Sequence, residues 1–149
     1  MKQTNLLQEN SKMPIIRIAP VCDGKIYVVP RVMEGEESPR MDLPIVESVE
    51  HVSTQSDKAA RRVTMKYRQH LHTDALPRFC VMHRSASSDA KTIYLYVLPL
   101  RNKDEIHFLG GEWVSEEDID TRPETFSPDL QTESGLLGMA AELWADFYL

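Results

Sequence analysis

The segment at residues 92–98, Thr-Ile-Tyr-Leu-Tyr-Val-Leu, constrains the fold of this chain more than any other segment does. Successive side chains of an extended strand point to opposite faces, and here both faces are apolar or aromatic. Such a strand is typical of the centre of a sheet. The sequence therefore predicts a sheet whose middle strand is buried on both sides.

Further strands and helices are expected around this strand. Two apolar runs, 15–21 and 26–29, are joined by Asp23-Gly24, a dipeptide that favours tight turns, and they predict a β-hairpin. The charged segment 32–42 is expected to be a solvated loop. The other expected strands are an extended piece within 42–52 and the segments 78–83 and 105–114, of which the last is interrupted at Gly110-Gly111. Helices are expected to begin near Ser53 or Ser56, at Glu116 and at Pro128.

These elements predict one α+β domain over residues 14–149, a sandwich built on a mixed sheet. The polar segment 1–13 has no hydrophobic periodicity and is expected to be a disordered or loosely attached tail. The last helix is expected to dock through Trp144 and Phe147. Alternatively, the apolar ending 145–149 could form a dimer surface.

Composition limits the function classes. A net charge of −6 over 149 residues argues against a general nucleic-acid binder. No apolar run is long enough to cross a membrane and no secretory leader is visible, so the cytoplasm is the expected location. Cys22 and Cys80 lie in apolar runs and are expected to be buried free thiols. Cys80 and His83 are expected on opposite faces of a strand, which argues against a catalytic pair.

The segment 58–72 is the electrostatic opposite of its surroundings. It holds five of the 17 Lys and Arg residues of the chain and none of its 23 Asp and Glu residues. At 100° per residue, its apolar and basic side chains separate onto two faces, which predicts an amphipathic helix with a cationic outer face. The apolar face is Ala59, Ala60, Val63, Tyr67 and Leu71, and the basic face is Lys58, Arg61, Arg62, Lys66 and Arg68.

Four segments resemble, in order and spacing, parts of the Nudix hydrolase family. They are the hairpin Asp23–Arg31, the tripeptide Asp42-Leu43-Pro44, the helix start Ala59-Ala60-Arg61-Arg62 and the late element Glu112–Ile119. With the elements around them, the resemblance covers about residues 15–147, nearly the whole of the expected domain. The resemblance implies a Nudix-like α/β/α sandwich with a mixed sheet, in a family that hydrolyses nucleoside diphosphate derivatives with Mg²⁺ or Mn²⁺.

The diagnostic box of that family, Gly-x5-Glu-x7-Arg-Glu-apolar-x-Glu-Glu-x-Gly-apolar, is not met. Ile45 and Val46 stand where its paired glycines are expected, and its Glu-Glu pair falls on Met65-Lys66 or Lys66-Tyr67. The divalent metal needs carboxylates, and a face of Lys and Arg repels it. We therefore expect no catalytic residue and no cofactor, and the usual hydrolysis is expected to be absent.

The first functional hypothesis is a non-hydrolytic module that binds an anionic, nucleotide-like ligand or a protein partner. Arg61, Arg62 and Lys66 would supply positive charge, and Tyr94 or Trp113 an aromatic wall. On a simpler interpretation the aromatic residues fill the core and the basic face is a solvated surface. Its charges would then be balanced by nearby acids: Glu34, Glu36, Glu37, Glu47 and Glu50.

Two other hypotheses stay open. An atypical hydrolase of a nucleoside diphosphate derivative could hold Mg²⁺ or Mn²⁺ through relocated ligands, for which Glu47, Glu50 and Glu116 are the candidates. Alternatively, the chain could be a structural homodimer with no small ligand. The expected partners are therefore an anionic small molecule or a second copy of the chain, with no nucleic acid and no membrane.

Overall fold

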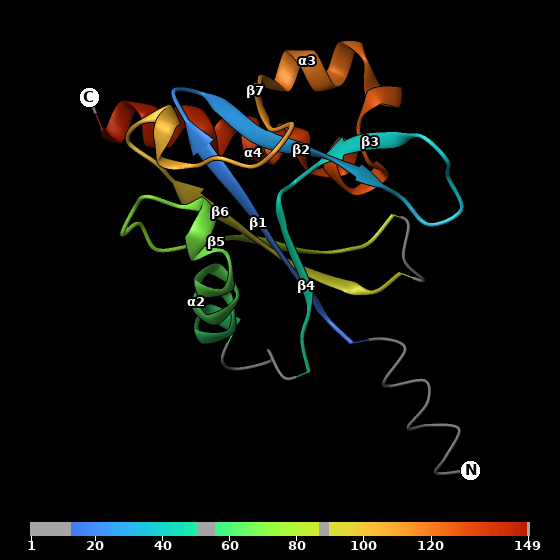
Figure 1. Cartoon of the computed structure of the whole chain (residues 1–149), viewed down its shortest axis with the longest axis horizontal. Helices are drawn as coiled ribbons and strands as arrows, with labels where there is room; N and C mark the ends of the chain where they lie inside the picture. Colours follow the sequence, from blue (N-terminus) through green and yellow to red (C-terminus); the bar gives the residue numbers. More distant parts are fainter. Residues whose placement is uncertain (1–12, 51–55, 87–89, 149) are drawn as a thin grey trace.

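The computed structural model describes residues 13–50, 56–86 and 90–148. In this part of the chain, a mixed sheet of seven strands has α2 on one face and α3 and α4 on the other (Figure 1). The α+β sandwich expected from the sequence is confirmed. The expected tail, except for Met13, and Ser53 lie outside the described residues.

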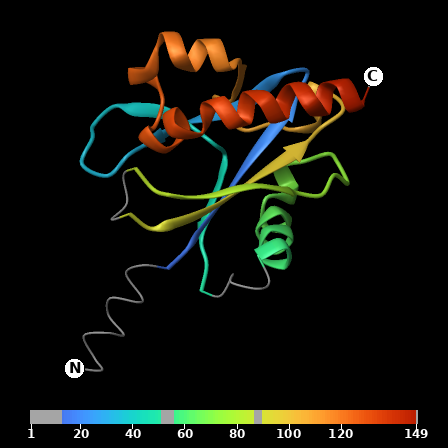
Figure 2. The ribbon, with the colours of Figure 1, turned by 180° about the vertical axis from the view of Figure 1, so that it is seen from behind.

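The parallel pair of β1 (Ile15–Cys22) and β6 (Thr92–Pro99) forms the middle of the sheet. Every residue of β1 is buried, and β6 has β1 on one side and β5 (Arg78–Arg84) on the other. The segment predicted as a central strand is therefore central. In the view from behind, α4 lies across this part of the sheet (Figure 2).

The other edge of β1 is shared by two strands. β4 (Ile45–Ser48) pairs antiparallel with its first half, and β2 (Lys25–Val32) pairs with its end. The turn between β1 and β2 has positive φ at both Asp23 (52°) and Gly24 (75°), as the expected hairpin requires. β2 in turn pairs with β3 (Pro39–Asp42) and β7 (Glu112–Val114).

Two strand predictions need correction. The segment 32–42 is not only a loop, because β2 runs on to Val32 and pairs there with Pro39 at the start of β3. The segment 105–114 is a strand only at β7. Gly110, with φ 75°, lies in a turn, and Ile106 makes a single bridge to Leu71.

The basic segment forms α2 (Ser56–Lys66), shorter than the expected helix. A 3₁₀ turn, Arg68–His70, follows it, and Leu71 is buried beyond that turn. The expected apolar face is confirmed within the helix, where Ala59, Ala60 and Val63 are buried. These residues pack on the same side of the sheet as Ile16 and Ile18 of β1.

The opposite face of the sheet is covered by α3 (Glu116–Thr121) and α4 (Pro128–Phe147). Ser115 and Ser127 cap these helices, their hydroxyls accepting hydrogen bonds from the Asp118 and Leu130 amides. α4 contacts the core through Leu130, Leu137 and Ala141, with Trp144 packed beside them.

The docking role predicted for Phe147 is wrong, because 73% of its surface is exposed. None of the helices in the described ranges combines the length and the apolar character that a membrane crossing would need.

Candidate functional site

The five predicted ligand residues are divided among different surroundings. Arg62 and Lys66 line a hollow of about 440 Å³ between α2 and the end of β4, together with Ser48 and Glu50. Arg61 lines a second hollow, of about 430 Å³, on the other flank of α2. Tyr94 and Trp113 are among the described residues but line neither of these hollows.

The basic side chains of α2 have few acidic neighbours. Lys66 Nζ lies 4.0 Å from Glu47 Oε2, and it is the one base of the predicted cationic face with a carboxylate within that distance among the described residues. Glu36, one of the acids expected to balance the helix, pairs with Arg40 instead, at 2.9 Å. The outer face of α2 therefore keeps most of its positive charge.

Glu47 also contacts the end of the helix. The Tyr67 hydroxyl donates a hydrogen bond of 3.3 Å to Glu47 Oε1. Burial, together with the adjacent Glu47 charge, raises the pKa of Tyr67. Tyr67 therefore stays a neutral donor at physiological pH, and it orients Glu47 at the edge of the hollow that holds Lys66.

Aromatic rings fill the space between β2, the turn before β7 and the end of α2. The Tyr27 ring packs edge-on against Trp113 at 5.1 Å between centroids. Its hydroxyl accepts a 3.0 Å hydrogen bond from the Phe108 amide, and the His70 ring stacks on Phe108 at 4.0 Å. Trp113 and Tyr94 both pack against the α2-side core, so contact with a base remains a prediction for both.

The candidate metal ligands do not converge. Glu50 lines the hollow beside α2, whereas Glu116 lines a hollow at the α3 end, with Glu117 and Glu142. Within the described ranges, no group of three or more His, Cys, Asp or Glu side chains is placed to hold a metal ion. Whether relocated acids hold the divalent cation that a Nudix hydrolase uses therefore stays a prediction.

Sequence reasoning missed a buried ionic network on the other face of the sheet. Arg17 of β1 is 2% exposed and lies among apolar neighbours. Its Nη2 donates to Asp42 Oδ1 at 2.9 Å and to Glu133 Oε1 at 2.7 Å, and its Nε donates to Glu133 Oε2 at 2.8 Å. A single guanidinium thus joins β1, β3 and α4. The sequence signal was an arginine inside the apolar run Ile15–Cys22.

Further contacts complete this network. The Ser127 hydroxyl, which caps α4, donates to Asp42 Oδ1 at 2.7 Å. Burial alone would raise the pKa of Asp42, but the charge and hydrogen bonds of Arg17 hold it below its ordinary value. Burial would likewise lower the pKa of Arg17, and the charges of Glu133 and Asp42 raise it instead. Arg17 and Asp42 are therefore both charged at neutral pH.

His83 also reaches Glu133, because β5 contains a bulge. Its Nε2 lies 2.8 Å from Glu133 Oε2. The register shifts between Phe79 and Val81, so that Cys80 and Val81 both pack against the α4-side core. The prediction that Cys80 and His83 lie on opposite faces is therefore wrong.

Cys80 lies on the same face of β5 as His83, but its thiol is not activated. Burial and the charge of Glu133 raise the pKa of the Cys80 thiol, which disfavours the thiolate. Cys22, buried as predicted, has its pKa raised by burial to about 11. Both cysteines are free thiols whose raised pKa disfavours the reactive thiolate. Cys80 is half-buried, less than predicted.

The contact of His83 with Glu133 predicts a pH-dependent stability. The hydrogen bond to Glu133 raises the pKa of His83 above 6.5, so its contribution is fully present below that pH and is lost as the pH rises through the folded-state pKa. We expect His83→Gln to lower the unfolding free energy by about 1 kcal/mol at pH 5.5 and by much less at pH 9. Urea unfolding at both pH values measures this, and an equal loss at both would contradict it.

The comparisons with known proteins bear on the fold alone. No protein-family model matches the sequence, and neither does any curated protein. Among solved structures, a Nudix hydrolase from Nitrosomonas europaea superimposes with a TM-score of 0.54 at 14% identity, covering 86% of this chain and 88% of the other. The E. coli ORF135 protein gives 0.55 at 20% identity, covering 89% and 94%.

A third similar structure comes from a protein complex. The C-terminal domain of mouse MUTYH, solved in a complex with human PCNA, gives a TM-score of 0.57 at 12% identity, covering 87% of this chain and 89% of that one. These identities are too low to transfer an activity. The similarity nevertheless extends over most of this chain and most of each solved structure, and the chain has the fold of the Nudix hydrolases.

Proposed function

We propose that this chain is a Nudix-like module that binds a phosphate-bearing, nucleotide-like ligand through α2 and does not hydrolyse it. The supporting observation is the hollow of about 440 Å³ beside α2, which Arg62 and Lys66 line. In one register of the sequence resemblance, these two residues fall where the family has metal-binding acids. The binding groups are thus cations, which bind phosphate directly where a hydrolase would bind it through a metal ion.

The chemistry of the two side chains suits a phosphate group. The Arg62 guanidinium offers paired donors that match two phosphate oxygens, and Lys66 adds a mobile point charge. At 4.0 Å, the contact of Lys66 with Glu47 is too long for a strong hydrogen bond, so the ammonium remains able to reach an anion. Glu50 in the same hollow limits the number of phosphate groups that fit without repulsion.

A base could extend this site. Tyr94 and Trp113 lie on the same side of the sheet as α2, and we propose them as the aromatic contacts of a nucleobase. Arg61 lines the hollow on the opposite flank of α2, and its charge would attract the anionic ligand from a distance without contacting it. Inorganic phosphate as a probe reports on the Arg62 and Lys66 contacts alone, whereas ADP also reports on the aromatic residues.

Calorimetric titration with ADP and with inorganic phosphate tests the proposal. We expect Arg62→Glu to weaken ADP binding at least tenfold, which corresponds to about 1.4 kcal/mol, because a donor is replaced by a repelling charge. Lys58→Glu is the matched control, since Lys58 is exposed on the same helix and lines neither hollow beside it. Equal weakening by both variants would indicate a non-specific charge effect, and the absence of any ADP binding would reject the proposal.

Hydrolysis with relocated ligands is the second candidate, favoured by the position of Glu47 and Glu50 next to the same helix. Turnover of a panel of nucleoside diphosphate derivatives with Mg²⁺ or Mn²⁺ tests it. Metal-dependent hydrolysis that is lost in Glu47→Gln or Glu50→Gln would replace the binding proposal with an enzymatic one.

Self-association is the third candidate. The outer surface of α4 exposes a row of large apolar side chains at helical spacing, which is unusual for a surface that stays in water. Light scattering of the purified chain at micromolar concentration tests this, and a monomer would reject it. The row consists of Leu136, Met139, Leu143 and Phe147.

A further inference from the structure

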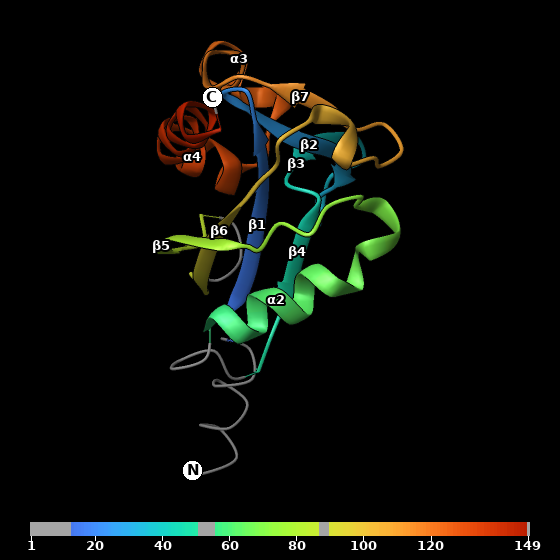
Figure 3. The same ribbon diagram turned by 90° about the vertical axis from the view of Figure 1, so that its left-hand side faces the viewer.

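β5 (Arg78–Arg84) is an edge strand. Among the described residues it pairs only with β6. Its other side lies between α4 and α2, with neither helix covering it in the view from the side (Figure 3). An edge of this kind presents main-chain N–H and C=O groups that can pair with another extended segment.

Apolar side chains follow this edge on the side of the sheet that carries α2. The Phe79 ring packs edge-on against Tyr96, at 5.4 Å between centroids, and Met82 lies opposite Tyr94 across the β5–β6 pair. Each keeps about half of its surface in water, since the exposed fractions are 51% and 55%. Such exposure of large apolar residues along an open strand is a feature of binding surfaces.

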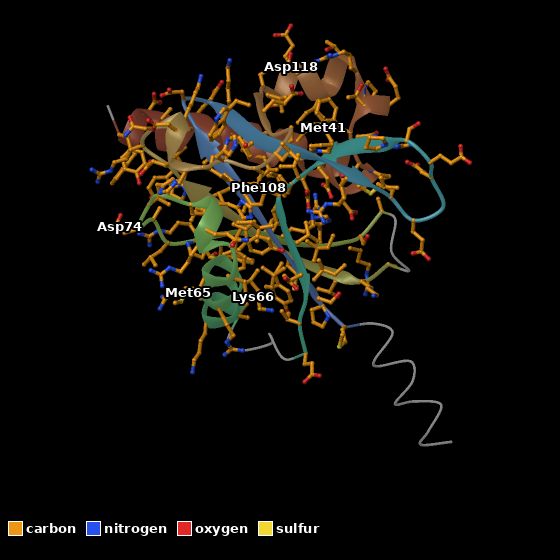
Figure 4. All side chains as sticks on the ribbon, in the orientation of Figure 1. Met41, Met65, Lys66, Asp74, Phe108 and Asp118 are labelled. Atoms are coloured by element: carbon orange, nitrogen blue, oxygen red, sulfur yellow. The ribbon has the colours of Figure 1, made fainter. Side chains whose placement is uncertain are left out.

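A hollow continues this apolar surface toward α2. It has a volume of about 430 Å³ and lies between α2 and the segment that leads into β5. Met65 and Leu76 line it and are 59% and 48% exposed. Met65 is on α2 and Asp74 on the facing loop, so the hollow lies between these two labelled residues (Figure 4). We call this hollow together with Phe79 and Met82 the β5 groove.

The charge of the β5 groove is positive. Arg61 and Arg68 line the hollow, and Asp74 is the acid that accompanies them. Arg78 and Arg84, the first and last residues of β5, are exposed at the ends of the strand, with the Arg78 guanidinium lying over the Trp144 ring on the α4 side. A partner with carboxylates between its apolar side chains would therefore be favoured over a neutral or basic one.

We propose that the β5 groove binds an extended peptide segment of a partner protein, in which apolar and acidic residues alternate. The peptide backbone pairs with the open edge of β5. Its apolar side chains contact Phe79, Met82 and the hollow, and its carboxylates pair with Arg61 and Arg68. The two proposals share Arg61, but the contacts that carry the anion-binding site are Arg62 and Lys66, which line the hollow on the opposite flank of α2.

A second copy of the chain is a poorer occupant. If two β5 strands paired antiparallel about Val81, Arg78 of each copy would face Arg84 of the other. Like charges directly opposite each other destabilise a strand pair. Arginines at both ends of the strand thus disfavour self-pairing and favour an acidic segment.

Selection from a phage-displayed library of random dodecapeptides against the immobilised full chain tests the proposal. We expect enrichment of sequences with apolar residues at every second position and Asp or Glu between them. A synthetic peptide of the most enriched sequence should slow hydrogen exchange at the β5 amides. Its affinity, measured by fluorescence anisotropy, should fall at least tenfold in Met82→Lys and in Arg61→Glu.

Leu109→Lys is the matched control, because Leu109 is the most exposed of the large apolar residues and lies outside the groove. It should bind the peptide as the unchanged chain does. Any of four results would overturn the proposal: no enriched peptide, enrichment of basic peptides, binding without protection of β5, or loss of binding in Leu109→Lys. A dimer in light scattering that Met82→Lys dissociates would identify a second copy as the occupant.

Discussion

Glu133→Ala is expected to lower the unfolding free energy by about 3–5 kcal/mol, the range for breaking a buried ion pair by removing one partner. Glu133 is 1% exposed, and its carboxylate receives hydrogen bonds from Arg17 and His83. Without it, the buried Arg17 guanidinium keeps Asp42 as its one acidic partner among the described residues. Urea unfolding followed by circular dichroism measures the change.

Glu142→Ala is the control for this variant. Glu142 lies on the same helix, also carries a carboxylate and is exposed, so its removal should change the stability by no more than about 0.5 kcal/mol. Equal stability of the Glu133→Ala and Glu142→Ala variants would contradict the prediction and would mean that the network around Arg17 does not hold α4 to the sheet. The triple variant Arg17→Met, Asp42→Asn and Glu133→Leu should recover part of the loss, since no buried carboxylate of the network is then left without its guanidinium.

Gly111→Ala is expected to destabilise the domain by about 1–3 kcal/mol, the range for overpacking a filled core. A Cβ at this position would collide with the Tyr27 ring and its hydroxyl. Tyr27 cannot move aside freely, because it is packed against Trp113 and its hydroxyl accepts a hydrogen bond from the Phe108 amide. The substitution therefore strains the whole aromatic cluster on the α2 side of the sheet.

Gly135→Ala provides a control of opposite sign. Gly135 lies within α4, and apart from its chain neighbours and the backbone of its own helix, no atom of the described residues lies within 4 Å of the position where its Cβ would be. Alanine there should stabilise the helix by up to about 1 kcal/mol. Thermal unfolding of both variants checks the pair, and a Gly111→Ala protein as stable as the unchanged chain would show that Tyr27 has room to shift.

The elements predicted best were those fixed by local pattern. The β1–β2 hairpin followed from Asp23-Gly24, and the central position of β6 followed from its two apolar faces. The ends of elements were predicted less well. β3 was missed because Pro39, Arg40 and Asp42 are poor strand formers, and the segment becomes a strand by pairing with the extended end of β2.

The candidate site was predicted in part, because helix geometry separates neighbours in sequence. Arg61 and Arg62 are adjacent, yet a rotation of about 100° per residue places them on opposite flanks of α2 and in different hollows. The network around Arg17 could not be predicted, because its partners come from strands and helices far away in sequence. The face of the sheet on which His83 lies depends on the β-bulge between Phe79 and Val81, which the local sequence pattern does not predict.

The distance in sequence between Arg17 and Glu133 also affects how the chain is made. The two residues are 116 positions apart, and synthesis at roughly 5–20 residues per second separates their appearance by on the order of ten seconds. During that time β1 carries a guanidinium that has no Glu133 to neutralise it, so the face of the sheet beneath α4 cannot close. The nascent chain therefore stays open on that side until α4 has been synthesised.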